Sequence, residues 1–287
     1  MDHIYEQRSN PENAKHRVSF KARLGVCLKK RKKLLLKTAS VIVTAARWFL
    51  IWFVAAKRVG RDFILPSPTS AIGKFFEIIA RKEFLSIALG SMIRVILGFL
   101  IGAVIGTVSA FAAHFVLPLK IFLSPLMKVI RATPVASFIL IAVLWMDSKS
   151  VPVFIAFLMV FPIVYGNAVT GLSETDALLK ESAEMYGFSP IKKFTVLYFP
   201  SASPYIGSAC LTSMGLAWKS GIAAEVLCVT MKSVGYYIYT SKMYFETEEF
   251  FAWTITVILL SVMLEGVMKL AAKVIVKTFG RRYAGVK

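Results

Sequence analysis

The chain has 287 residues, of which 57% are hydrophobic, and its formal net charge is +19. Soluble domains contain only about 45–50% apolar residues, so this composition indicates a polytopic membrane protein rather than a soluble core. The basic residues flank the apolar runs, which argues against nucleic acid as a partner and favours orientation in a membrane and contact with anionic lipid.

The long apolar runs predict an all-α membrane protein with six transmembrane helices. After a basic N-terminal tail (residues 1–33), the predicted spans are residues 34–56, 85–115, 135–146, 151–169, 206–230 and 250–276. The transmembrane domain therefore covers residues 34–276. Residues 231–249 are expected to form an external loop, and residues 277–287 a basic C-terminal tail.

A stripe of small residues marks the second predicted span. Gly98, Gly102 and Gly106 recur there every four residues. Small residues at this spacing allow two helix backbones to approach closely in lipid. We therefore expect this side of the helix to pack tightly against another helix, although the pattern says nothing about a substrate.

The distribution of Lys and Arg predicts the orientation of the spans. If both termini lie inside the cell, the inner segments contain more than twice as many Lys and Arg residues as the outer ones. Positive charge accumulates on the cytoplasmic side of membrane proteins. Both tails and the polar segment at residues 173–204 are therefore expected in the cytoplasm.

This polar segment is the longest helix-favouring polar stretch in the chain and predicts a compact helical hairpin. Thr175 or Asp176 is suited to cap the first helix by accepting a backbone N–H bond. Gly187 follows at the place where a helix commonly ends in a left-handed residue. Ser189 begins a second short helix, and Pro200 is expected to stop it. The hairpin would form a projection to which another protein could bind.

The order of residues in this loop resembles one family closely. Permease subunits of bacterial ABC importers carry a cytoplasmic loop with E-A-A, three residues, G, nine residues, I, one residue and L-P. The spacing matches throughout, with conservative departures at the second, fifth and sixth of these positions. The matching residues are Glu181-Ser182-Ala183, Gly187, Leu197 and Phe199-Pro200. Three further stretches are similar to the subfamily serving nitrate, sulfonate, taurine and thiamine-precursor importers: Leu65-Pro66-Ser67-Pro68, Arg131-Ala132-Thr133-Pro134 and Gly215-Leu216-Ala217-Trp218.

The resemblance implies a type I ABC importer permease fold in a multi-pass protein of the bacterial inner membrane. It implies that the loop docks into a groove on a separate ATPase subunit, which would bind ATP and Mg²⁺, so that this chain needs no cofactor. It also implies two copies of the chain working with two ATPases and an extracytoplasmic solute-binding protein. The subfamily suggests a small anion such as a sulfonate or nitrate, while thiamine precursors use similar permeases.

No motif for catalysis or metal binding is recognisable. Trp218-Lys219-Ser220 lacks the glycine that a Walker A phosphate loop places before its lysine. The cysteines are far apart, and each histidine is isolated from residues at metal-ligand or catalytic spacing. We therefore predict that the chain is not an enzyme and holds no metal.

Lys219 and Glu225 are the candidates for a translocation path, because both are charged residues within the fifth predicted span. Six residues apart on a helix, they point about 120° apart and are not expected to form one site unaided. Either Lys219 lines the path and attracts an anionic or polar group, or it pairs structurally with Glu225 or with a charge on a neighbouring helix.

Two other functions are compatible with the sequence. An ATP-independent secondary transporter or channel would need an inverted repeat or ion ligands within the membrane, and no repeat is recognisable. A structural membrane scaffold would use the loop to bind a partner other than an ATPase. Co-purification of an ATPase separates the importer from both alternatives.

Overall fold

The structure, a computed structural model, describes residue 40 and residues 43–284, with side chains as far as Lys273. The chain divides into two compact units, residues 1–68 and 69–287. In the first unit a helix covers residues 43–59 and ends at Gly60. The φ of Gly60 is +62°, a left-handed conformation that suits a residue without a Cβ atom. The predicted basic tail and the beginning of the first predicted span lie outside the described residues.

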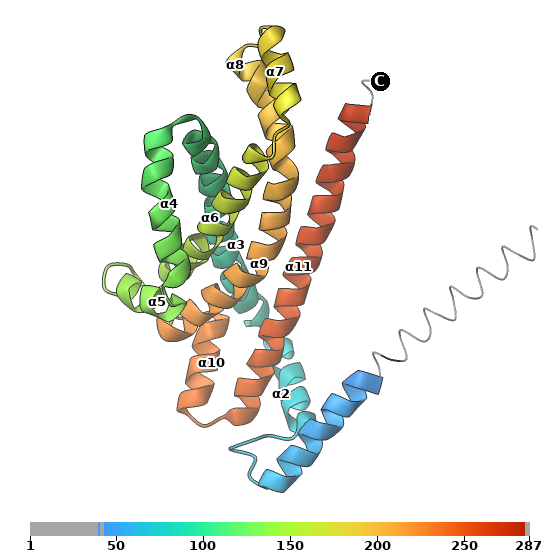
Figure 1. The fold of residues 1–287 in the computed structure, drawn as a ribbon. Helices are drawn as coiled ribbons and strands as arrows, with labels where there is room; N and C mark the ends of the chain where they lie inside the picture. Colours follow the sequence, from blue (N-terminus) through green and yellow to red (C-terminus); the bar gives the residue numbers. More distant parts are fainter. Residues whose placement is uncertain (1–39, 41–42, 285–287) are drawn as a thin grey trace, which may run out of the picture. The chain divides into compact units, whose positions relative to one another are not determined.

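In the second unit every regular element of the described residues is a helix, so the predicted all-α fold class is confirmed. Figure 1 shows α7 and α8 projecting beyond one end of α9, whereas α10 lies at the other end and α11 runs beside α9. The elements in chain order are α2 (Pro68–Ala80), α3 (Phe84–Phe115), α4 (Leu117–Ala132), α5 (Val135–Val143), α6 (Val151–Ser173), α7 (Ala177–Met185), α8 (Pro190–Lys193), the π-helical turn η3 (Phe194–Tyr198), α9 (Phe199–Leu227), α10 (Val234–Met243) and α11 (Thr247–Ala284).

Three helical segments are long and apolar enough to cross a membrane, namely α3, α6 and residues Thr247–Lys273 of α11. They correspond to the second, fourth and sixth predicted spans. α9 has 29 residues and is therefore about 44 Å long, but its polar residues keep it below the apolar content of these three segments. α11 continues past the predicted end at residue 276, so the predicted C-terminal tail is helical as far as Ala284.

The third predicted span, residues 135–146, is not a crossing helix by itself. α5 has nine residues and is about 14 Å long, which is less than half of the ~30 Å hydrocarbon core of a bilayer. α4 and α5 instead form a pair bent by 100° at Thr133-Pro134, where the proline cannot continue the helix. Leu123, Met127 and Ile130 bury one side of α4 in a cluster with residues of α3 and α6.

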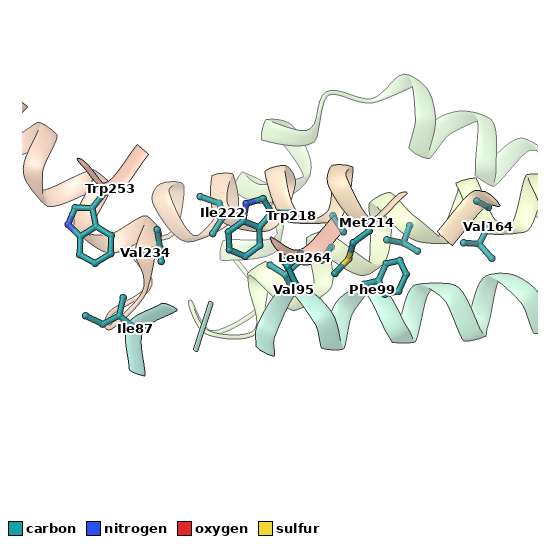
Figure 2. Packing of buried hydrophobic residues seen from close by; sticks show 14 of the residues in the cluster. Ile87, Val95, Phe99, Val164, Met214, Trp218, Ile222, Val234, Trp253 and Leu264 are labelled. Carbon is teal, nitrogen blue, oxygen red and sulfur yellow. The ribbon is translucent and has the colours of Figure 1, made fainter. Parts of the chain in front are cut away.

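The main core is built from buried residues of α3, α6, α9 and α11, together with Ile78 of α2 and Val234 of α10, and Figure 2 shows part of this cluster. Trp218 of α9 and Trp253 of α11 are its largest fully buried side chains. The indole N–H of Trp218 donates to the carbonyl of Val257 at 3.1 Å, which links α9 to α11. The buried indole therefore has a partner for its one polar atom, as burial requires.

The predicted glycine stripe faces α6. A Cβ atom at Gly98 would lie 2.2 Å from the carbonyl oxygen of Val153, and one at Gly102 would lie 2.8 Å from the Cβ of Val160. At Gly106 the nearest atom would be the carbonyl oxygen of Phe161, at 3.0 Å. The α3 and α6 backbones thus approach so closely that larger residues would force them apart.

The predicted external loop at residues 231–249 contains a helix, α10, that the sequence analysis missed. Its N-terminus is capped by Ser233, whose Oγ accepts a bond from the backbone N–H of Tyr236 at 3.0 Å. The helix is not amphipathic, because polar and apolar residues are mixed around it. The sequence therefore has no helical periodicity there to predict it.

Candidate functional site

The first arm of the polar loop is α7, and its two ends are held by local bonds. Asp176 caps the helix, since its side chain accepts from the N–H of Leu178 at 2.8 Å. At the other end the N–H of Phe188 reaches the carbonyl of Ala183 at 2.9 Å, and the N–H of Gly187 donates at 3.0 Å to the carbonyl of Glu184. These two bonds form a Schellman motif, which requires the left-handed φ of +61° seen at Gly187.

The second arm differs from the prediction because Pro200 does not end a helix. Ser189 caps α8 by accepting from the N–H of Lys192 at 3.3 Å. The chain then stays helical through α8, η3 and α9 without interruption. η3 is a wide turn in which the N–H of Phe199 donates to the carbonyl of Phe194. Pro200 lies in the first turn of α9, a position where its missing N–H is tolerated.

The outer surface of the loop carries large apolar side chains. Met185 is 87% exposed, Tyr186 80% and Ile191 78%. Leu178 and Leu179 are exposed on the same short hairpin. Gathered apolar groups of this kind on a small projection are typical of a surface that binds another protein.

The residues that carry the loop motif divide into inward-facing and outward-facing ones. Ala183 and Leu197 are buried within the chain, whereas Glu181 and Ser182 are exposed. The hydroxyl of Ser182 donates to the carbonyl of Leu178 at 2.7 Å. Glu181 forms no ion pair with any described residue. Its charge therefore remains available to a partner.

Glu225, one of the two predicted path residues, lies in a buried ion pair and not on an open surface. Its side chain is fully buried, and Arg94 of α3 approaches its Oε1 at 2.8 Å through Nη2 and at 2.9 Å through Nε. The cost of an unpaired charge in the core explains why a cation lies beside it. In this conformation Glu225 is therefore paired within the chain, and its place in the path stays a prediction.

Further donors complete the surroundings of Glu225. Its Oε2 accepts from the hydroxyl of Ser91 at 2.8 Å and from the N–H of Gly235 at 3.2 Å. Ser91 Oγ in turn accepts from the N–H of Val234 at 3.0 Å. The carboxylate therefore joins α9 to α3 and to the first turn of α10. We call these five residues, Ser91, Arg94, Glu225, Val234 and Gly235, the Glu225 cluster.

The partner of Glu225 was not predicted from the sequence, although one signal was present. Arg94 is a lone cation in the apolar α3, just as Glu225 is a lone carboxylate in α9. Opposite charges in two membrane-embedded helices commonly pair with each other. The contact joins residues 131 positions apart, and nothing in the local pattern indicates which helices are neighbours.

Lys219 lies apart from the Glu225 cluster. Its side chain is exposed and forms no ion pair with the residues that the structure describes, so neither pairing expected for it is present. Ser208, Thr212 and Ala223 are also exposed and fall on the same face of α9 as Lys219 at helical spacing. This face, which we call the α9 polar face, presents small and hydroxyl side chains, one cation and the partly exposed Leu216.

Comparison with known proteins supports the expected resemblance. The chain is 30% identical to a protein named as an aliphatic sulfonates transport permease, SsuC, of Bacillus subtilis (strain 168), over 66% of this chain and 68% of that one. It is 20% identical to the taurine transport system permease protein TauC of Escherichia coli (strain K12), over 79% of this chain and 85% of the relative.

The fold is similar to a solved one, a crystal structure of an amino acid ABC transporter with histidines. The TM-score is 0.56 at 16% identity, and the match covers 67% of this chain and 93% of that chain. The predicted permease fold is therefore confirmed. The family profile of binding-protein-dependent transport system inner membrane components matches residues 98–277, which is more than half of the chain. The chain thus belongs to this family of multi-pass inner-membrane transport permeases, which are not enzymes.

Proposed function

We propose that this permease subunit belongs to an ATP-driven importer and carries a small anionic solute across the bacterial inner membrane. The observation that carries the proposal is the loop of α7 and α8, with Met185, Tyr186 and Ile191 exposed at its surface. Exposed apolar side chains on a projection of this kind are stabilised when a partner covers them. In this family the resembling loop docks on a separate ATPase, which would hold ATP and Mg²⁺.

Each residue of the loop motif has a part in this contact. Glu181 and Ser182 face the ATPase, where Glu181 meets a basic group. Ala183 is small enough for α7 to pack closely, and Gly187 sets the turn that presents the apolar groups. Leu197 anchors the second arm in the membrane domain, and Pro200 lies in the first turn of α9.

The α9 polar face is the surface that we assign to the path. The ammonium group of Lys219 attracts an anion by about 4 kcal/mol at 4 Å in surroundings of intermediate polarity. The sulfonate and taurine permeases described above are named for solutes that contain a sulfonate group, which carries such a charge. A small sulfonate is therefore the solute class that we favour.

The importer would contain two copies of this chain, two ATPases and an extracytoplasmic solute-binding protein. Six spans and cytoplasmic termini agree with the excess of Lys and Arg in the segments assigned to the inside. ATP binding would favour the outward-open state, because the closed ATPase pair binds that state more tightly, and hydrolysis would restore the inward-open state. Lipid surrounds the complex.

Purification of the intact protein from mild detergent tests the proposal. We expect an ATPase to co-purify with the parent chain and to be lost from a Glu181→Lys, Gly187→Asp double variant that remains folded. A Gly207→Ala variant serves as the control, because a Cβ there would meet no atom within 4 Å. If no ATPase accompanies the parent, an ion-gradient transporter, a channel or a scaffold becomes the better description.

The role of Lys219 has a separate test. We expect Lys219→Met to lower the uptake of taurine or ethanesulfonate by at least about tenfold, which corresponds to about 1.4 kcal/mol of lost attraction. Lys128→Met, which removes an exposed cation from α4, should leave uptake unchanged. Normal uptake by Lys219→Met at normal protein levels would remove Lys219 from the path.

A further inference from the structure

The base of the cytoplasmic loop contains an aromatic cluster that the proposed function does not explain. Phe111 of α3 lies with its ring centroid 5.0 Å from that of Phe194 and 6.5 Å from that of Phe199. The rings of Phe194 and Phe199 are themselves 6.2 Å apart. Phe194 opens η3 and Phe199 follows its last residue, so one side chain of α3 contacts both ends of the wide turn.

A second set of rings continues the contact along the last turn of α3. Tyr198 of η3 lies 5.2 Å from His114 and 5.3 Å from Phe115, measured between ring centroids, and both pairs meet edge to face. Phe111 is 8% exposed, and it packs in a small buried cluster with Leu172 of α6 and Ala202 of α9. Edge-to-face and tilted ring pairs of this kind have specific geometry and add to the energy of simple burial.

The position of η3 indicates which helices these rings connect. A π-helical turn inside a helix is uncommon and is frequently found at functional sites. Here it lies between α8, which belongs to the loop, and α9, which carries the polar face. The rings join this turn to α3. α3 is in turn packed against α6 through Gly98, Gly102 and Gly106.

We propose that Phe111, Phe194, Tyr198 and Phe199 are positioning residues that transmit movement of the loop into the α3–α6 pair and along α9. The proposal rests on the coupling role of the loop proposed above. When the ATPase displaces the loop, the rings move η3 and the end of α3 together, so that the membrane helices respond as one body. Without the rings, the loop would pivot at η3 and its movement would not reach the α9 polar face.

The experiment uses the whole importer in vesicles and a readout that needs no solute. Cys27, Cys210 and Cys228 are replaced by Ser, and Thr212→Cys places one thiol on the α9 polar face. Labelling of this thiol by a membrane-impermeant maleimide is measured with and without ATP and Mg²⁺, and ATP hydrolysis is measured on the same vesicles. The variants are Phe111→Ala and Tyr198→Ala. The conservative variant is Tyr198→Phe, which keeps the ring.

Phe161→Ala is the matched control. Phe161 of α6 is 7% exposed and stacks on Phe157 at 5.5 Å, so it resembles Phe111 in type, burial and ring contact, but it belongs to another cluster. We expect the two linkage variants to retain the ATPase and to hydrolyse ATP. Their ATP-dependent change in labelling should fall by between about 2-fold and 30-fold, the range for residues that carry coupling between sites. Tyr198→Phe and Phe161→Ala should respond as the parent does.

Each other outcome has a defined meaning. A normal labelling response in Phe111→Ala or Tyr198→Ala overturns the linkage and leaves the proposed function intact. An equal loss in Phe161→Ala also overturns it, because any lost aromatic packing would then have the same effect. If the parent neither retains an ATPase nor responds to ATP, the proposed function fails and the linkage fails with it. If Phe111→Ala does not fold, Tyr198→Ala, which leaves the buried ring in place, decides the question.

Discussion

The long helical stretch formed by α8, η3 and α9 has two ends of opposite character. At the Glu225 cluster, the Glu225 side chain is fully buried and accepts hydrogen bonds from Arg94, Ser91 and the N–H of Gly235. At the other end, the loop holds its shape through local caps and exposes its large apolar side chains. The polar groups at the first end have partners within the chain, whereas the apolar side chains of the loop are exposed and available to another protein.

This difference indicates which end is fixed and which is free to move. A buried polar network in which each member has a partner rigidifies the helices that it joins. A hairpin held mainly by bonds between near neighbours opens at lower free energy than the core does. We therefore expect the ends of α3, α9 and α10 that meet at Glu225 to stay together while the loop follows its partner. Substitutions at the Glu225 end should therefore cost more stability than substitutions in the loop.

The largest effect is expected from Glu225→Ala. The substitution leaves Arg94 mostly buried without a counter-charge, which costs about 3–5 kcal/mol. The midpoint of thermal unfolding in detergent should fall strongly. A double variant, Arg94→Met with Glu225→Met, removes both charges and should lose less stability. If the single variant is as stable as the double one, the Glu225 cluster does not hold the ends of α3, α9 and α10 together.

A smaller loss is expected from Gly235→Ala at the same end. The new Cβ would lie 2.3 Å from the Cβ of Glu225 and 2.6 Å from the N of Val226, so α10 has to move away from α9. Overpacking of this kind costs about 1–3 kcal/mol. Gly266→Ala in α11 is the control, because its Cβ would meet no atom within 4 Å and the helix should gain up to about 1 kcal/mol. Equal thermal midpoints for the two variants would contradict the tight contact.

At the other end, Gly187→Ala should act locally. No neighbouring atom obstructs a Cβ there, so the cost arises only from the left-handed φ and amounts to about 1 kcal/mol. Amide hydrogen exchange in residues 176–193 should accelerate about fivefold, while the thermal midpoint of the whole protein changes little. Gly187→Asn should show a weaker effect, because Asn tolerates this conformation. A large drop in the thermal midpoint would show instead that the loop is part of the core.

The smallest effect is expected from Glu184→Gln. It removes an ion pair with Lys193 at 3.6 Å in which the Glu184 side chain is 71% exposed. Exposed pairs contribute about 0–1 kcal/mol and are screened by salt. Exchange of the loop amides should therefore rise slightly at low salt and match the parent at high salt. A salt-independent effect would mean that Glu184 has another role.

Much of the fold and of the loop could be predicted from sequence because the relevant patterns are local. Long apolar runs predict α3 and α6, since about twenty apolar residues are needed to cross lipid. The turn at Gly187 and the caps at Asp176 and Ser189 depend on residues within a few positions of each other. The same property explains the failure at Pro200, because the wide turn before it has no recognisable sequence signal.

Contacts between residues far apart in the chain could not be predicted in this way. The sequence indicates an all-helical membrane chain, the place of its polar loop and a small-residue face on α3. It did not reveal that Glu225 pairs with Arg94, that Lys219 stays unpaired among the described residues, or that α5 is too short to cross a bilayer. The physical reason is that apolar periodicity shows that a side is buried but not against what. The close approach of helices then selects the partners, and burial makes each unpaired charge costly.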